Sequence, residues 1–243
     1  MAPELPWRPL AGVITQPVLL ERIGRVSSAL TARSGDPAAD VDRRVAASVT
    51  QLGLVARVVA PALAAQTLGQ PLDLRLGGLW WQDTLGGPLP FSVPQPAGPD
   101  TASPAGVSPV AAGPITAGPV TASTATSGGV AADLDRLVSE LLAEVVVPIT
   151  AAVAALTPVS DRVLWGNVAS AVNGAASQLA RARPDLAPAA WATAAGFFRH
   201  PELGTEPGPP GPSFRRSSCC LIYRLEPGPA AAVCGDCVLG GRH

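Results

Sequence analysis

Apolar residues recur every three or four positions along most of the chain. The stretches with this spacing are 16–33, 39–69, 130–157, 161–182 and 185–199. Such a repeat is typical of helices that bury one face. Pro61 should end or kink the second stretch, and Ser160 can cap a helix over 161–182. We therefore predict a mainly α fold with a bundle-like helical body.

A different pattern occupies residues 72–93. Leu72, Leu74 and Leu76 alternate with charged residues, which predicts a short strand. Glycine pairs at 77–78 and 86–87 then indicate turns. A small β-hairpin is the expected result.

Residues 95–128 have a different composition from the rest of the chain. They are rich in Pro, Ala, Gly and Thr, have one charged residue and no aromatic residue, and cannot bury enough apolar area to fold. We predict a disordered linker there. The predicted regions are a helical part with a short β segment at 1–94, the linker at 95–128, a second helical part at 129–200 and a compact cysteine segment at 213–243.

Charge and hydropathy exclude some classes of partner. All 17 basic residues are Arg, and the net charge is −1, which gives no electrostatic reason to bind nucleic acid or anionic lipid. The longest uncharged apolar run lies between Glu144 and Asp161 and is interrupted by two prolines. It is shorter than the roughly 20 residues of a membrane span, and residues 1–10 lack the apolar core of a secretory signal. We expect a cytoplasmic protein with no integral membrane segment and no nucleic-acid partner.

The candidate chemistry is concentrated near the C-terminus. All four cysteines lie between residues 219 and 237. Cys219 and Cys220 are adjacent, and Cys234 and Cys237 form a C-x₂-C motif. Thiols stay reduced in the cytoplasm, so a metal site is favoured over disulfides.

The spacing alone leaves three alternatives open. A zinc site would use four thiolates, although it commonly uses two C-x₂₋₄-C pairs. An iron–sulfur cluster is larger, so adjacent side chains could reach different irons or be bent onto one. A redox-active dithiol pair is the third possibility.

The sequence also predicts local structure around the cysteines. Gly235 is expected to take a positive φ and turn its N–H toward a sulfur. Residues 221–225 alternate like a short strand.

The motif "SSCCLIYRL…CGDCVL" resembles the C-terminal signature of the FhuF-like ferric-siderophore reductases. Three other segments are also similar to this family: 58–65, 79–93 and 158–175. The spacer between the cysteine pair and the C-x₂-C motif is thirteen residues here, and nearer ten in the family. The extra residues fall in a turn, where insertion costs little.

The resemblance implies a 2Fe–2S cluster as cofactor. Its ligands, for both cofactor and metal, would be Cys219, Cys220, Cys234 and Cys237. The implied activity is an oxidoreductase that reduces a ferric siderophore, of hydroxamate type, with electrons from a separate donor protein. No catalytic side chain is expected beyond the cluster.

Other residues near the motif could serve the same function. The arginines that could contact the substrate or adjust the cluster are Arg215, Arg216 and Arg224. On the helix over 161–182, Gly166, Ser170, Asn173 and Ser177 share one face, which indicates close helix packing or a polar cleft. The alternative functions are a 2Fe–2S electron carrier or iron-responsive binding protein without a siderophore substrate, and a zinc-stabilised interaction protein.

Overall fold

The structure is a computed structural model of the whole chain. It describes residues 7–34, 41–70, 72, 74–84, 90–92, 127–203, 208–225 and 233–240. Almost all of the predicted linker at 95–128 lies outside these ranges, and its last two residues begin helix α3.

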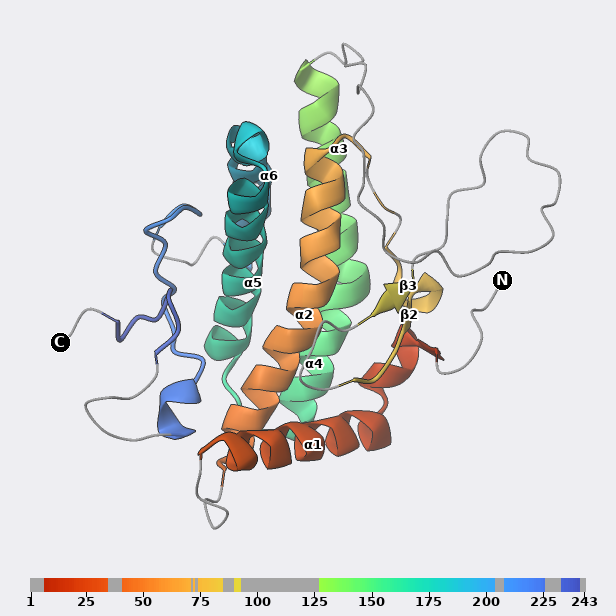
Figure 1. The fold of residues 1–243 in the computed structure, drawn as a ribbon. Helices are drawn as coiled ribbons and strands as arrows, with labels where there is room; N and C mark the ends of the chain where they lie inside the picture. Colours follow the sequence, from red (N-terminus) through yellow and green to blue (C-terminus); the bar gives the residue numbers. More distant parts are fainter. Residues whose placement is uncertain are drawn as a thin grey trace, which may run out of the picture.

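The body is a bundle of helices (Figure 1). The mainly α prediction is confirmed, and the helices start and end close to the predicted positions. Their bounds are α1 Gln16–Ser34, α2 Arg43–Thr67, α3 Ser127–Leu141, α4 Val147–Leu156, α5 Asp161–Ala182 and α6 Ala187–Phe198. Short 3₁₀ turns follow or precede them: η1 Leu10–Ile14, η2 Leu76–Gly78, η4 Pro184–Leu186 and η5 Ile222–Leu225.

Helix α2 is the central element, packed against α1, α4, α5 and α6. Val45, Val55 and Val59 on its apolar face are fully buried. The helix does not end at Pro61 but continues to Thr67. Ala62 and Leu63, directly after the proline, are also fully buried, so core packing holds this part helical despite the missing N–H.

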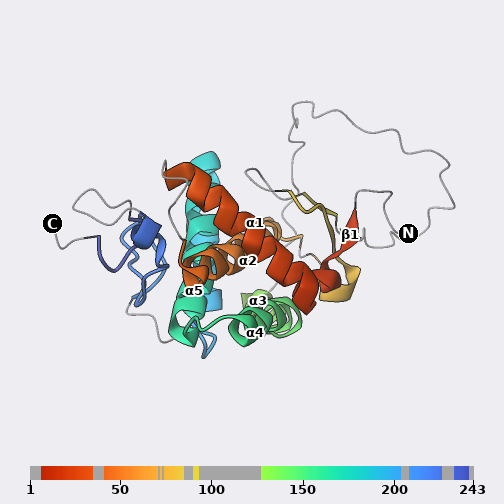
Figure 2. The same cartoon turned by 90° about the horizontal axis from the view of Figure 1, so that it is seen from below.

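Helices α3 and α4 form one long rod. The π-helical turn η3 (Leu142–Val146) joins them, and Pro148 lies in the first turn of α4, where a proline is tolerated. Helix α1 lies across one end of the bundle (Figures 1 and 2). Two segments, Arg43–Thr67 and Ala132–Leu156, are long and apolar enough to cross a membrane. In each segment, half or more of the apolar stretch is buried inside the protein, as in core helices.

A small antiparallel sheet lies on one side of the bundle. Its strand order is β1 (Arg8–Pro9), β2 (Trp80–Trp81) and β3 (Phe91–Ser92). Trp81 pairs with both Arg8 and Phe91 and is buried. The predicted hairpin is therefore present as β2–β3, with β1 added at its edge.

The strand predicted over residues 72–76 is wrong for the described residues. Leu76 begins the 3₁₀ turn η2, and Leu72 and Leu74 have no strand partner. Leu74 is buried and Leu72 packs against the same core. The alternation of apolar residues thus reflects packing on the helices rather than a strand.

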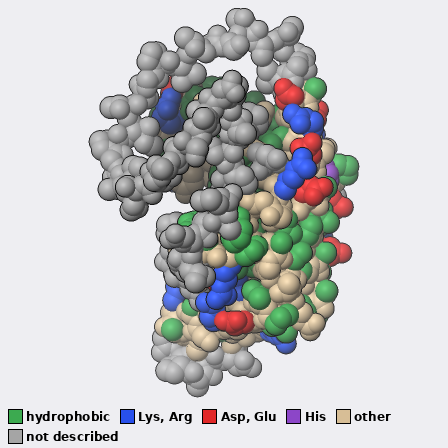
Figure 3. Space-filling model, turned by 90° about the vertical axis from the view of Figure 1, so that its right-hand side faces the viewer, with side chains coloured by type: hydrophobic (Ala, Val, Ile, Leu, Met, Phe, Trp, Pro, Cys, Tyr) green, Lys and Arg blue, Asp and Glu red, His purple; other side chains and the backbone are tan. Residues whose placement is uncertain are grey.

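Charged side chains of both signs, with hydrophobic ones between them, lie on the face that carries the sheet (Figure 3). Arg22 and Arg25 on α1 both donate to Asp83 after β2, and Arg22 also lies 5.1 Å from the Trp81 ring centroid. This pairing fixes α1 against the sheet segment.

Candidate metal centre

The cysteine segment lies beside α5, on the opposite side of the bundle from the sheet (Figures 1 and 2). Turn η5 contacts α1 and α2. The backbone N–H of Arg216 donates to the carbonyl of Asp236 over 3.1 Å. This bond holds the chain before the adjacent cysteines alongside the C-x₂-C loop.

The chain turns sharply just after the adjacent cysteines. Leu221 has φ 71°, a left-handed conformation that is rare for a residue with a side chain. Residues Ile222–Leu225 then form a 3₁₀ turn, so the strand predicted here is wrong. The Ser48 hydroxyl donates to the Cys220 carbonyl over 3.0 Å and ties this turn to α2.

The four sulfur atoms come together as two pairs. Cys220 Sγ lies 3.7 Å from Cys234 Sγ, and Cys219 Sγ lies 4.0 Å from Cys237 Sγ. Cys220 and Cys237 are buried, whereas Cys219 and Cys234 are partly exposed. Each pair therefore combines one buried thiol with one that reaches toward solvent.

Backbone amides donate to one of these pairs. The Leu221 N–H lies 3.3 Å from Cys219 Sγ, and the Leu239 N–H lies 3.4 Å from Cys237 Sγ. The N–H···S role expected for Gly235 is thus taken by two leucines. Gly235 does not have the expected positive φ, which among the described glycines occurs at Gly69.

Arg216 contacts the other pair, Cys220 and Cys234, through a hydrogen bond. Its Nη2 donates to Cys234 Sγ over 3.2 Å, and its Nη1 donates to Asn167 Oδ1 over 2.8 Å. The side chain is only 1% exposed. The substrate contact predicted for Arg216 therefore has no accessible surface to use.

Asn167 links this arginine to the middle of the bundle. Its Nδ2 donates to the Ser48 hydroxyl and to Gln51 Oε1, each over 3.0 Å. Gln51 in turn donates to Thr150 Oγ1 over 3.2 Å. A buried polar chain thus runs from α4 through α2 and α5 to Cys234.

The pKa values of the thiols differ because of these contacts. The hydrogen bond with Cys234, together with the nearby Arg216 charge, lowers the pKa of Cys220 to about 6, although burial opposes this. The same hydrogen bond, with burial, raises the pKa of Cys234. Burial raises the pKa of Cys219 to about 11. Cys220 is therefore more readily deprotonated for metal binding than Cys219 or Cys234.

Arg216 remains charged in its buried position. Burial by itself would lower its pKa, but the nearby Cys220 and Cys234 side chains and the Asp236 carboxylate raise it above its usual value. A buried cation needs such counter-charges because desolvation penalises it strongly.

The two other predicted arginines lie at the surface. Arg215 is exposed, and its guanidinium donates to the Phe214 carbonyl over 3.1 Å. Arg224 is exposed and pairs with Asp42 at the start of α2 over 2.8 Å. A substrate role for either one stays a prediction.

The polar face predicted on α5 separates into different roles. Gly166 is buried, and Asn173 Oδ1 accepts a hydrogen bond from the Gly211 N–H over 2.8 Å. Ser170 donates to the Asp236 carboxylate and so contacts the C-x₂-C loop. This face therefore holds the C-terminal segment on the bundle.

Ser170 also lies at the edge of a groove between α2 and α5. The groove has a volume of about 600 Å³ and is mostly apolar. Residues that line it include Leu52, Ala56, Ala60, Ser170, Gly174 and Gln178. Small side chains leave this space open, and Ser170 connects its lining to the C-x₂-C loop through Asp236.

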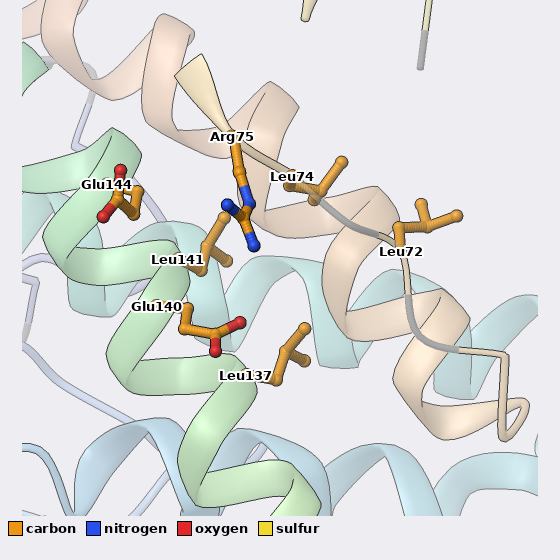
Figure 4. Close-up of a pocket in the computed structure, with 7 residues that line it drawn as sticks. All are labelled: Leu72, Leu74, Arg75, Leu137, Glu140, Leu141 and Glu144. Atoms are coloured by element: carbon orange, nitrogen blue, oxygen red, sulfur yellow. The ribbon is translucent and has the colours of Figure 1, made fainter. Parts of the chain in front are cut away.

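A smaller hollow of about 140 Å³ lies elsewhere, between residues 72–75 and the α3–η3 rod (Figure 4). Arg75 lies over Leu141, with Glu140 and Glu144 from the rod nearby. Its lining includes no cysteine and no residue of the Arg216–Asn167 network, so it is separate from the cysteine site.

The donor set fits an iron–sulfur centre. Metal–thiolate bonds of about 2.3 Å place two sulfurs on one tetrahedral metal about 3.8 Å apart, close to the spacing within each pair. Within the described part of the chain, no three Cys, His, Asp or Glu side chains are arranged so that they could hold one metal ion. The buried Arg216 and the two leucine amides suit a group with negative charge on its sulfurs.

The fold and this site define a helical protein with a four-cysteine centre docked against α5. The family model described as "FhuF 2Fe-2S C-terminal domain" matches residues 216–239. The chain is thus FhuF-like in its C-terminal cysteine motif, which points to an iron–sulfur cluster. The match begins at Arg216 and includes all four cysteines. No curated protein and no solved structure matches the chain.

Sequence reasoning did not find the buried network. It grouped Arg216 with the surface arginines, and it did not connect Ser48 and Gln51 to the cysteines. A signal was present, because these two polar residues interrupt the apolar face of α2. A polar residue in a buried stripe is normally hydrogen-bonded there.

Proposed function

We propose that this protein is a ferric-siderophore reductase with a 2Fe–2S cluster held by Cys219, Cys220, Cys234 and Cys237. The observation that carries the proposal is the match of the FhuF 2Fe-2S domain to a segment whose four thiols lie together. When bound, such a cluster supplies a one-electron centre. Siderophores bind Fe(III) through hard oxygen donors and hold Fe(II) far more weakly, so one electron is enough to release the iron.

The residues of this chain suit that role. The thiols of Cys219 and Cys234 are partly exposed, so one edge of the proposed centre would lie near solvent. Ser170 and Asp236 hold the C-x₂-C loop against α5. The electrons would come from a separate donor, and the protein would work in the cytoplasm.

The groove between α2 and α5 is the proposed place for the ferric siderophore. Its volume of about 600 Å³ lies within the roughly 300–1,000 Å³ typical of small-molecule sites. Its residue Ser170 contacts the loop between Cys234 and Cys237. A complex lying there would be next to the cysteine segment without displacing any core side chain.

The first experiment measures iron, acid-labile sulfide and zinc in protein purified without oxygen, followed by EPR after dithionite. Two irons and two sulfides per chain with a reduced S = ½ signal support the cluster. One zinc without sulfide would leave a structural site and reject the reductase. Cys234→Ser is expected to lose the cluster, and a variant with full iron and sulfide would reject the ligand assignment.

The second experiment adds a ferric hydroxamate to the reduced protein and traps released Fe(II) with a ferrous chelator. Stoichiometric Fe(II) release supports the reductase, whereas a cluster that stays reduced indicates an electron carrier. Gly174→Leu fills the groove, since a Cβ there meets no atom within 4 Å. It should raise the ferric hydroxamate concentration that gives half-maximal Fe(II) release, with cluster content unchanged, while Gly24→Leu, equally open but on α1, should not.

A further inference from the structure

The adjacent cysteines belong to different sulfur pairs. Cys219 lies with Cys237, and Cys220 lies with Cys234, at 4.0 and 3.7 Å between sulfurs. Consecutive side chains in a chain point apart, and the left-handed Leu221 turns the backbone away directly after them. Both spacings are near the roughly 3.8 Å expected for two thiolates on one tetrahedral metal.

The two pairs have different electrostatic surroundings. Arg216 donates to Cys234 with a buried guanidinium, and its other nitrogen is fixed by Asn167. The contacts to Cys219 and Cys237 that the described residues provide are backbone amides, from Leu221 and Leu239. The Cys220/Cys234 pair is in direct contact with the Arg216 cation, with the Asp236 carboxylate also near Cys234 and the Ile222 amide at Cys220. The amides that contact Cys219 and Cys237 are neutral.

We propose that the site consists of two unequal halves, each pair binding one metal atom, with Arg216 stabilising negative charge on the Cys220/Cys234 half. Arg216 acts as a positioning residue through Cys234, and Asn167 fixes its direction. The inference rests on the proposed iron–sulfur centre but not on the siderophore substrate. If a one-electron donor such as dithionite reduced one of the two ferric irons that a loaded cluster would hold, the added electron should reside on the half beside Arg216.

The pairing can be tested without any metal. In apo-protein treated with diamide, each disulfide forms as two thiols give up two protons and two electrons to the reagent. Mapping by mass spectrometry should show Cys220–Cys234 and Cys219–Cys237 as the first products. Cys219–Cys220 or Cys219–Cys234 as the main product would overturn the pairing. This result does not depend on whether the natural metal is iron or zinc.

The role of Arg216 is tested on the cluster-loaded protein with Arg216→Gln and Arg216→Lys. The reduction potential should fall in the Gln variant and recover in part in the Lys variant, because only Lys retains the charge. Arg136→Gln removes an arginine on α3 whose side chain is 66% exposed, and it should leave the potential unchanged. Equal potentials in wild type and Arg216→Gln would overturn the assignment.

A spectroscopic readout keeps the test valid if the Gln variant binds the cluster poorly. Mössbauer spectra of reduced ⁵⁷Fe protein separate the ferrous from the ferric site. Arg216→Lys should alter the ferrous site more than the ferric one, since the contact to Cys234 changes. A change confined to the ferric site would reject the inference. Wild type without iron and sulfide would instead reject the proposed function, and the disulfide map would still report on the pairing.

Discussion

Arg216 Nη1 lies 2.8 Å from Asn167 Oδ1, inside the protein, and joins the cysteine segment to the middle of α5. Both side chains are almost fully buried. The arginine therefore depends on Asn167 for one of its few partners, and Asn167 depends on α2 for its own. Changes in the bundle interior should affect the cysteine site through this contact.

Asn167→Ala should destabilise the apo-protein by about 2–4 kcal/mol, because it removes the acceptor for the buried Arg216 Nη1 and the donor to the buried Gln51 Oε1. The measurement is the free energy of unfolding from denaturant titration. Gln178→Ala, on the exposed side of the same helix, serves as the control and should change it by less than about 0.5 kcal/mol. Equal values for the two variants would show that the network contributes nothing to stability.

Asp83 connects the sheet segment to α1 through Arg22 and Arg25. Asp83→Ala leaves Arg22, with a side chain only 6% exposed, as an unpaired buried cation. A loss of about 3–5 kcal/mol is expected from breaking such a buried pair. Thermal or denaturant unfolding measures it.

Glu21 provides the comparison for Asp83. It also pairs with Arg25, at 3.9 Å, but is 65% exposed. Glu21→Ala should therefore change stability by no more than about 0.5 kcal/mol, as for other exposed helix pairs. If the two variants lost similar amounts, burial of Arg22 would not be the cause.

Asp42 should give the apo-protein an acid-dependent stability. A hydrogen bond from the Arg44 side chain, with the Arg224 contact, lowers the pKa of Asp42 to about 2, although burial opposes it. Because the folded pKa lies below the unfolded value of about 3.9, the stabilisation is complete above pH 4. It is lost as the pH falls toward 2.

Asp42→Asn isolates this effect, because Asn also caps helices well but cannot ionise. Its unfolding free energy should fall less steeply between pH 4 and 2 than that of wild type. Asp42→Ala also removes the cap on the Arg44 N–H, for a further loss of about 0.5–2 kcal/mol. Identical pH slopes for wild type and Asp42→Asn would contradict the assignment.

The sequence predicted the helices well because their boundaries depend on local signals. The three- to four-residue spacing defined α1 and α5, and Ser160 occupies the N-cap position before Asp161, although its side chain makes no cap hydrogen bond. The cysteines were found because their spacing is itself the signal. The helix spacing and the cysteine spacing both depend on residues that are close together along the chain.

The wrong predictions involve contacts between distant segments. Leu72 and Leu74 alternate like a strand, but their partners are core helices. Residues 221–225 alternate in the same way, but Ile222–Leu225 form a 3₁₀ turn. A hydrogen bond from Ser48, 172 residues earlier in the chain, holds the adjacent Cys220 carbonyl. The position of Arg216 depends on Asn167, 49 residues earlier. A period-two pattern in a short segment does not distinguish a strand from a loop or turn that packs against helices.

Gly196 on α6 gives a test of how α6 packs against α3. A Cβ at this position would lie 2.5 Å from Leu134 Cδ2 on α3, too close for normal contact. Gly196→Ala should therefore destabilise the protein by about 1–3 kcal/mol, as overpacking does, despite the better helix propensity of alanine. Gly24 on α1 has open space, so Gly24→Ala should stabilise by up to about 1 kcal/mol.

If the clash is the cause, adding Leu134→Ala should make Gly196→Ala less harmful than it is in the wild-type background. Purely additive losses in a denaturant-unfolding double-mutant cycle would show that the two side chains do not interact.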